Sequence, residues 1–231
     1  MMKPITDSPY VVWDAKGYEK EKEQLLTVSV SKIYGEGEII YLQGQTSKEF
    51  FFVHEGRVKV SILREDGSEK ILSIQEQNTF FGEYAAFDRQ PHFATATALD
   101  RSKIGRIPIE GAVSAMKANP NVSLMIINRI ARKFRSLGFQ VEGLAFFDAE
   151  RRIARMLVSL AAEVGKPDTD GTTIRRGITH EALANLTGLS RVRVTTILNN
   201  FERGSIITKK RGSVTITDFV KLRSLIDEIP S

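Results

Sequence analysis

The sequence predicts an α+β fold: an N-terminal β-roll, a long dimerisation helix and a C-terminal winged helix-turn-helix. Between residues 25 and 109, short runs rich in Val, Ile, Phe, Tyr and Thr alternate with glycines, as in a sandwich or small barrel. At Asn121 the apolar spacing changes from two residues to three or four, which indicates a helix. Residues 179–203 then have the pattern of two short helices joined at Gly188.

Length and composition limit the possible classes of protein. A chain of 231 residues suits two domains, and 42% hydrophobic with 26% charged residues is typical of soluble globular proteins. No apolar run is long enough to span a bilayer and the N-terminus has no apolar signal core, so we expect a cytoplasmic protein without a membrane partner. The chain has no cysteine, which excludes disulfides and thiolate-ligated iron–sulfur clusters.

Three scattered histidines and no cysteine offer no catalytic constellation. We therefore expect no enzymatic activity, no catalytic residues, no metal site and no bound cofactor. The chain divides into an N-terminal arm (1–24), an effector-sensing β-roll (25–119), a central helix (120–147) and a DNA-binding domain (148–231). The clearest hairpin lies at 57–74, where Asp66-Gly67 is a strong turn signal.

The central helix carries an apolar stripe with nearly coiled-coil spacing, and Pro120 suits its first turn. A long helix with such a stripe between two domains is expected to pair with its twin in a homodimer. Burial of the stripe against the chain's own β-domain is the alternative, and both can hold. The stripe comprises Val122, Ile126, Ile130, Phe134, Leu137, Val141 and Leu144.

The pattern at residues 179–203 predicts a DNA-binding helix-turn-helix, with a helical hairpin inside a larger core as the alternative. Thr179 and Ser190 suit the N-caps of the two helices, while Val194, Ile197 and Phe201 recur at helical spacing. The first turn of the second helix therefore presents arginines and hydroxyls where a recognition helix touches base edges. The candidate DNA contacts in this motif are Thr179, His180, Ser190, Arg191, Val192, Arg193, Thr195 and Thr196.

Two β-branched runs joined by Lys209, Lys210, Arg211 and Gly212 predict a hairpin with a basic tip. Such a wing can lie along the sugar-phosphate backbone; an ordinary solvated turn is the alternative. Residues 171–217 contain eight Lys or Arg against two Glu, a basic excess suited to neutralising phosphates. Double-stranded DNA is therefore the predicted macromolecular partner, with Lys209, Lys210 and Arg211 contacting it from the wing.

The order of these motifs resembles the CRP/FNR superfamily of bacterial transcription regulators. The resemblance covers residues 25–217 and rests on EFFFVHEGRVKVSI, DGSEKILSI, FFGEYAAF, DAERRIARMLVSLA and the helix-turn-helix, in that order. It implies an effector-gated homodimer on a two-fold operator, with RNA polymerase as a further partner. By position, Arg191 matches the first arginine of the cyclic-AMP branch, whereas Val192 and Thr196 replace its glutamate and second arginine. We therefore expect an A/T-leaning half-site.

The same resemblance locates an effector site. Gly82, Glu83 and Tyr84 match the start of the phosphate-binding cassette, with Glu83 at the ribose-binding position; a surface or capping carboxylate is the alternative. Where that cassette has its arginine and serine, this chain has His92, Phe93 and Ala94. A ring and a methyl cannot replace a guanidinium as phosphate partners, so cyclic AMP is not expected.

The expected effector is a small organic acid or aromatic. Residues 66–70, Lys133 and Val192 resemble those of the halorespiration regulators, in which a lysine at the position of Lys133 contacts the effector. A solvated helical lysine is the plainer interpretation. Two alternatives stay open: a haem-dependent gas sensor with His54 or His92 as axial ligand, and a cyclic-nucleotide-binding regulatory module.

Overall fold

The computed structural model describes residues 10–11, 17–175, 179–210 and 212–227. The chain forms two compact units, residues 10–134 and residues 135–231 with the first nine, and one helix, α4 (Pro120–Phe146), runs from the first unit into the second. The two units are described separately. No helix among the described residues is long and apolar enough to cross a membrane.

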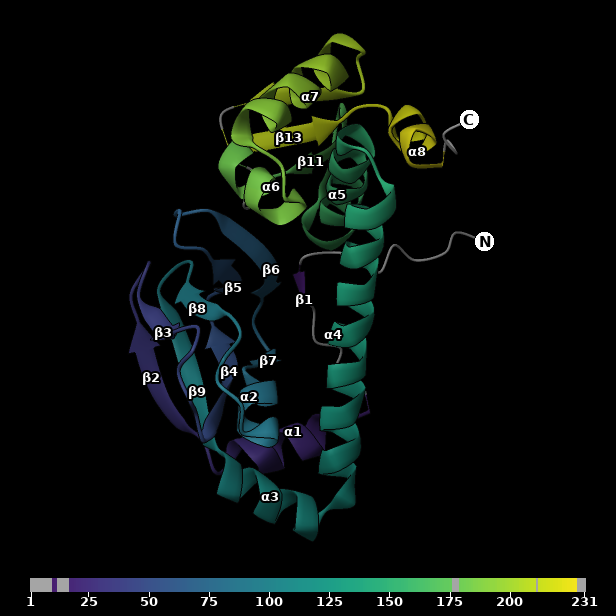
Figure 1. The fold of residues 1–231 in the computed structure, drawn as a ribbon. Helices are drawn as coiled ribbons and strands as arrows, with labels where there is room; N and C mark the ends of the chain where they lie inside the picture. The colour runs from purple at the N-terminus through teal and green to yellow at the C-terminus, as the bar shows by residue number, and fades with distance from the viewer. Residues whose placement is uncertain (1–9, 12–16, 176–178, 211, 228–231) are drawn as a thin grey trace. The chain divides into compact units, whose positions relative to one another are not determined.

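The first unit consists of two sheets with short helices at one end (Figure 1). One sheet has the order β1-β6-β5-β8-β3 and the other β2-β9-β4-β7, and all pairs are antiparallel except β1 with β6. This architecture confirms the predicted fold class. The elements are β1 (Tyr10–Val11), α1 (Glu19–Leu26), β2 (Val30–Tyr34), β3 (Ile39–Tyr41), β4 (Glu49–Glu55), β5 (Val58–Leu63), β6 (Glu69–Gln75), β7 (Phe80–Phe81), α2 (Glu83–Asp88), β8 (Thr95–Ala98), β9 (Ser102–Pro108) and α3 (Ile109–Ala118).

The strand β4 connects two cores because both of its faces are buried. Phe51 and Val53 point between the two sheets, whereas Phe50 and Phe52 point to the opposite side, where α1, α3 and α4 pack. Successive side chains of a strand alternate between its faces, so the run EFFFVHE supplies both cores at once. The predicted hairpin forms between β5 and β6, with Gly67 at φ +80° in its turn.

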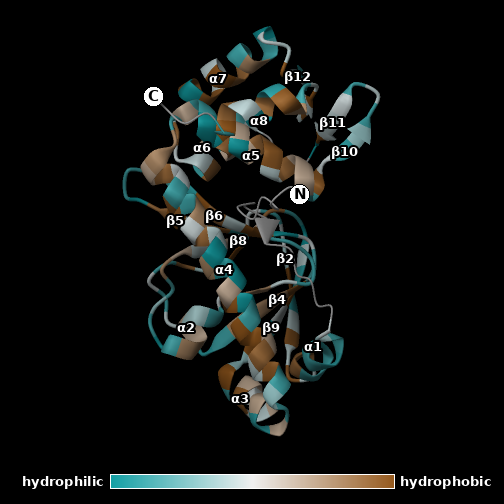
Figure 2. Ribbon diagram, turned by 90° about the vertical axis from the view of Figure 1, so that its right-hand side faces the viewer, coloured by the Kyte–Doolittle hydropathy of each residue, from teal (hydrophilic) through white to brown (hydrophobic). Residues whose placement is uncertain are grey.

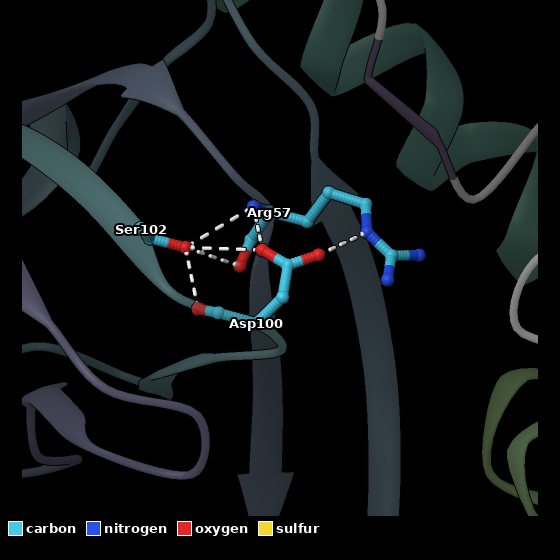
Figure 3. Close-up of polar contacts among 3 residues, drawn as sticks. All are labelled: Arg57, Asp100 and Ser102. Carbon is cyan, nitrogen blue, oxygen red and sulfur yellow. Dashed lines mark hydrogen bonds and ion pairs between the residues drawn. The ribbon is translucent and has the colours of Figure 1, made fainter.

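A polar network joins the turn before β5 to the turn before β9 (Figure 3). Arg57 donates its backbone N–H and its Nε to the two carboxylate oxygens of Asp100, each at 2.8 Å, and Ser102 donates its hydroxyl to the Asp100 carbonyl at 2.9 Å. The preceding residue, Gly56, has φ +83°, and a Cβ there would lie 2.7 Å from Ser102 Cα. Glycine is therefore required by backbone conformation and by space.

The helix α4 carries two stripes rather than one (Figure 2 shows hydrophobic and hydrophilic residues alternating along it). Val122, Met125 and Ile126 are buried in the core of their own unit. The prediction that Val122 and Ile126 belong to a dimer seam was therefore wrong, because the first turns of the helix are held by the roll. A separate stripe is exposed and comprises Ile127, Ile130, Phe134, Leu137, Val141 and Leu144.

The second unit packs three helices and a fourth, α8, around a small antiparallel sheet of order β10-β11-β13-β12. Its elements are α5 (Ala149–Val164), β10 (Lys166–Asp168), β11 (Gly171–Ile174), α6 (His180–Thr187), α7 (Arg191–Arg203), β12 (Ile207–Lys210), β13 (Ser213–Ile216) and α8 (Phe219–Asp227). Residues 165–171 were expected to be a loop, but they include β10, which pairs with β11. The strand expected before Thr179 extends partly into 176–178, outside the described residues.

Helix caps in this unit follow the predicted positions. Asp148, Thr179 and Ser190 each accept a hydrogen bond from the backbone N–H three residues later, at 2.8, 2.9 and 3.2 Å. Gly188 has φ +70° and ends α6, so the chain can turn into α7. Asp218 likewise accepts from Lys221 N at 2.9 Å before α8.

Candidate ligand site and nucleic-acid interface

The turn from β7 into α2 holds the residues matched to the phosphate-binding cassette. Gly82 has φ +75°, and a Cβ there would lie 3.0 Å from the Phe51 ring, so the backbone can approach the core only because the residue is glycine. Glu83 begins α2, and its side chain is only 3% exposed. The alternative of a surface carboxylate is therefore wrong.

Lys133 of α4 binds this buried carboxylate. Its ammonium donates to Glu83 Oε1 at 2.6 Å, to Oε2 at 2.9 Å and to the Phe80 carbonyl at 2.7 Å. These contacts use the three donors of an ammonium group. Burial lowers the pKa of Lys133 to about 8, although the Glu83 charge opposes the shift. Lys133 is therefore not a solvated helical lysine, and it already has a carboxylate partner within the chain.

Arg129 lies one turn before Lys133 on the same face of α4 and is also buried. Burial lowers its pKa to about 10, while the Glu83 carboxylate acts in the opposite direction. Sequence reasoning did not select Arg129. Its position four residues before Lys133, on the stripe that begins with Val122 and Met125, is the signal that could have identified it. The first unit therefore holds one buried carboxylate near two cations.

An aromatic cluster occupies the region expected to contact the effector. The His92 ring stacks on Tyr41 of β3, with centroids 3.7 Å apart and planes at 9°, and meets Tyr84 edge-on at 5.8 Å. The half-exposed Phe93 stacks on the outer side of Tyr84 at 4.3 Å, while Ala94 is fully buried. Tyr41 was not predicted from the sequence, because its strand is 51 residues away from His92.

Both nitrogens of His92 are buried without a hydrogen-bond partner among the described residues. Burial lowers the pKa of His92, and the nearby Asp88 charge opposes this shift. Burial also raises the pKa of Tyr84 to about 12, and the Tyr41 and Tyr84 hydroxyls lie 3.5 Å apart. The imidazole is consequently held neutral in an aromatic environment at neutral pH.

The second unit presents the first turn of α7 to solvent. Arg191, Val192 and Arg193 are exposed, Val192 to 76%, whereas Val194 and Ile197 on the opposite face are buried. The Thr195 hydroxyl bonds back to the Arg191 carbonyl and also lies 2.8 Å from His180 Nδ1. The hydroxyl of Thr196 bonds back to the Val192 carbonyl at 3.1 Å. Thr179 and Ser190 act as N-caps, as described above.

The wing is fastened to α7 by one of its predicted DNA contacts. Lys209 donates its ammonium to Asn199 and forms an ion pair with Glu202 at 3.1 Å, and its backbone N–H also donates to Glu202. The expectation that this ammonium is directed to DNA is corrected, because it links β12 to the helix. Lys210 is exposed, and Arg211 lies outside the described residues.

Comparison with known protein families matches both units. Residues 31–119 match the model of the cyclic nucleotide-binding domain, and residues 151–225 match that of the Crp-like helix-turn-helix domain. The chain belongs to the CRP/FNR superfamily. Members of this family are DNA-binding transcription regulators that join an effector-binding domain to a helix-turn-helix, and both parts are present in this chain.

Two relatives in the CRP/FNR superfamily align over most of the chain. The global nitrogen regulator of Synechocystis sp. is 27% identical over 195 residues, covering 84% of this chain and 87% of the relative. The CRP-like cAMP-activated global transcriptional regulator of Mycobacterium tuberculosis is 26% identical over 208 residues, covering 90% and 93%.

Solved structures of the superfamily share the fold. A CooA variant from Carboxydothermus hydrogenoformans superposes with a TM-score of 0.78 at 25% identity, covering 87% of this chain and 89% of that chain. CprK in complex with OCPA superposes with a TM-score of 0.74 at 20% identity, covering 94% and 97%.

The Lys133–Glu83 pair generates a prediction about stability. Lys133→Met leaves a buried carboxylate without its ammonium partner, so the free energy of unfolding should fall by about 3–5 kcal/mol. The double variant Glu83→Gln/Lys133→Met removes both charges and should recover most of that loss. Urea unfolding of the two single variants and the double variant measures this coupling. Additive losses in the double variant would contradict a direct pair.

His92 generates a prediction about pH. Because its folded pKa lies below the unfolded value near 6.5, its contribution to stability is complete above pH 6.5 and is lost as the pH falls below it. His54 and His180 also have lowered pKa values, so the wild-type curve contains three contributions. His92→Phe should reduce the slope between pH 6.5 and 5 by up to about 1.4 kcal/mol per pH unit in urea unfolding. An unchanged slope would show that His92 titrates normally.

Proposed function

We propose that the protein is an effector-gated regulator that binds a two-fold DNA operator as a homodimer. The observation that supports it best is the exposed first turn of α7, where Arg191, Val192 and Arg193 follow the Ser190 cap. Residues at the N-terminal end of a recognition helix are those that contact base edges in the major groove. Lys209 supports the same role indirectly, because its bonds to Asn199 and Glu202 hold the wing beside that helix.

The exposed residues of α7 suggest which bases are read. Arg191 can donate two hydrogen bonds to guanine or bind a phosphate, and Arg193 offers a second guanidinium. Val192 cannot accept a hydrogen bond from cytosine, but its methyl groups can pack on the methyl group of thymine. The proposed half-site therefore leans toward A·T pairs at the position of Val192. Two half-sites about one turn of DNA apart would follow from a two-fold dimer.

The exposed stripe of α4 supports homodimerisation. Ile127, Phe134 and Val141 are seven residues apart, as are Ile130, Leu137 and Leu144. Apolar residues in two interleaved sevenfold series form the seam of a coiled coil. Phe134, 77% exposed in the single chain, lies at the middle of this seam. A second copy of α4 is the partner that this spacing fits.

For the effector, we propose a small organic acid that competes with Glu83 for Lys133. Lys133 uses all its donors on Glu83 and Phe80, so a new anion must replace one of these partners. Several relatives are described as cAMP-activated, but positions 93 and 94 of this chain hold a phenyl ring and a methyl group. Neither can donate hydrogen bonds to a cyclic phosphate. Contacts that differ between two states of the dimer would then shift its DNA affinity.

The haem-sensor alternative receives no support from the histidines. The His92 ring is 1% exposed and lies against Tyr41, and Nε2 of His54 would clash with any Cβ at Gly105. Both imidazoles therefore face closely packed protein. RNA polymerase remains a proposed partner by family resemblance.

Arg191 provides the first test of this function. Arg191→Ala should weaken binding to a two-half-site operator by about 1–3 kcal/mol if the guanidinium contacts a base, and should relax sequence preference at that position. Arg203→Ala, at the exposed far end of α7, is the matched control and should change affinity little. Fluorescence anisotropy with a selected operator, at several salt concentrations, measures both. Equal losses in the two variants would indicate a general charge effect instead.

Phe134 tests the dimer seam. Phe134→Glu places two charges against each other across the proposed two-fold axis, so the variant should sediment as a monomer and lose cooperative binding to the two half-sites. Val220→Glu changes an equally exposed apolar residue on α8 and should remain dimeric. Sedimentation equilibrium distinguishes these outcomes. A dimeric Phe134→Glu variant would locate the interface elsewhere.

A further inference from the structure

The first unit contains a second cleft that does not include the residues of the proposed effector site. This cleft, which we call the outer cleft, has a volume of about 770 Å³ and is formed by residues 46–48, the end of α2 and one face of α3. Gly82, Glu83, Tyr84, His92 and Lys133 do not line it. A volume of this size is within the range of small-molecule sites.

Three cations surround the outer cleft: Lys48, Arg89 and Lys117. Glu110 is the one carboxylate in its lining, so the side chains carry a net charge of about +2 at neutral pH. Within the described parts of the chain, none of the three cations forms an ion pair. Their charges are therefore directed to whatever occupies the cleft.

The backbone of Arg89 supports a role for its side chain. Arg89 follows α2 with φ +60° and ψ +22°, a left-handed conformation that glycine adopts readily and other residues rarely do. A glycine at this position would end the helix at lower conformational cost. An arginine held in this conformation beside the cleft indicates that its guanidinium has a use there.

The remaining wall of the outer cleft is apolar and fixed. Phe87 stacks on the core residue Phe50 with centroids 5.7 Å apart, and Ile109 packs on the same core. Val113 lies one turn after Ile109 on α3. The Lys48 carbonyl accepts a hydrogen bond from Ile109 N at 2.8 Å, which fastens the segment carrying Lys48 to the start of α3. The cleft is consequently preformed, with cations beside an apolar wall.

We propose that the outer cleft binds a phosphomonoester with an aromatic or apolar body, such as a nucleoside monophosphate. A phosphomonoester carries a charge of about −1.5 to −2 at neutral pH, which matches the net charge of the lining. Guanidinium and ammonium groups bind its oxygens with charge-assisted hydrogen bonds, and its ring packs on Phe87, Ile109 and Val113. This proposal is independent of the effector proposed for Lys133.

Calorimetric titration of the full chain with adenosine 5′-monophosphate, in 0.15 M salt, tests it. We expect one site per chain, with inorganic phosphate and adenosine each binding at least about tenfold more weakly, because each lacks half of the complementary chemistry. Lys117→Gln and Arg89→Gly should each weaken binding about tenfold. Arg89→Gly should also retain the fold, since glycine takes this backbone conformation without strain.

Two controls distinguish the outer cleft from other sites. Lys20→Gln removes an exposed charge from α1, away from the lining, and should bind adenosine 5′-monophosphate as the wild type does. Glu83→Gln/Lys133→Met alters the interior site and should also leave binding unchanged. Loss of binding in this double variant with retention in Lys117→Gln would overturn the proposal. Equal affinity for inorganic phosphate, or no measurable binding of adenosine 5′-monophosphate at millimolar concentration, would overturn it as well.

Discussion

The buried contact between Lys133 and Glu83 is the interaction on which the first unit depends. Removing an ammonium and a carboxylate from water is unfavourable, and only close pairing with additional hydrogen bonds offsets it. Here the Phe80 carbonyl supplies the third acceptor, so no donor of Lys133 is left unsatisfied. The pair joins α4 to the turn between β7 and α2, and it does so at the position that the family uses for its effector. Structural support and ligand chemistry therefore share the same two side chains.

The two stripes of α4 explain how such a contact can influence a dimer. Val122, Met125 and Lys133 lie on the stripe that faces the roll, while Ile130 and Phe134 lie on the exposed stripe. A helix transmits displacement because its backbone hydrogen bonds keep both stripes rigidly related. A change in the partner of Lys133 would therefore alter the seam only if it moves or rotates the helix. This condition restricts gating to ligands whose contacts differ between two positions of α4.

Local features were predictable from the sequence, and long-range partners were not. Asp148, Thr179 and Ser190 were identified as caps because capping depends on residues three positions apart. The fold class followed from periodicity in the same way. The partner of Lys133 is 50 residues distant, and Tyr41 reaches His92 across the sheet, so no local pattern contains either contact. The seam was misassigned at its start because an inward stripe and an outward stripe overlap near residue 126, and spacing alone does not say which one faces the roll.

The pairing of Lys133 also limits the charge of an effector that acts on it. An acidic ligand can replace Glu83 and keep the ammonium paired, whereas a neutral ligand that separated the pair would leave two buried charges without partners. The displaced carboxylate need not become isolated, because the buried Arg129 lies near enough to influence it electrostatically. Exchange of one carboxylate for another conserves the net charge around Lys133, and the energetic difference then comes from the rest of the ligand against Tyr84 and the neighbouring rings. This is why an aromatic or apolar acid fits the site better than a small inorganic anion, which would offer no such contacts.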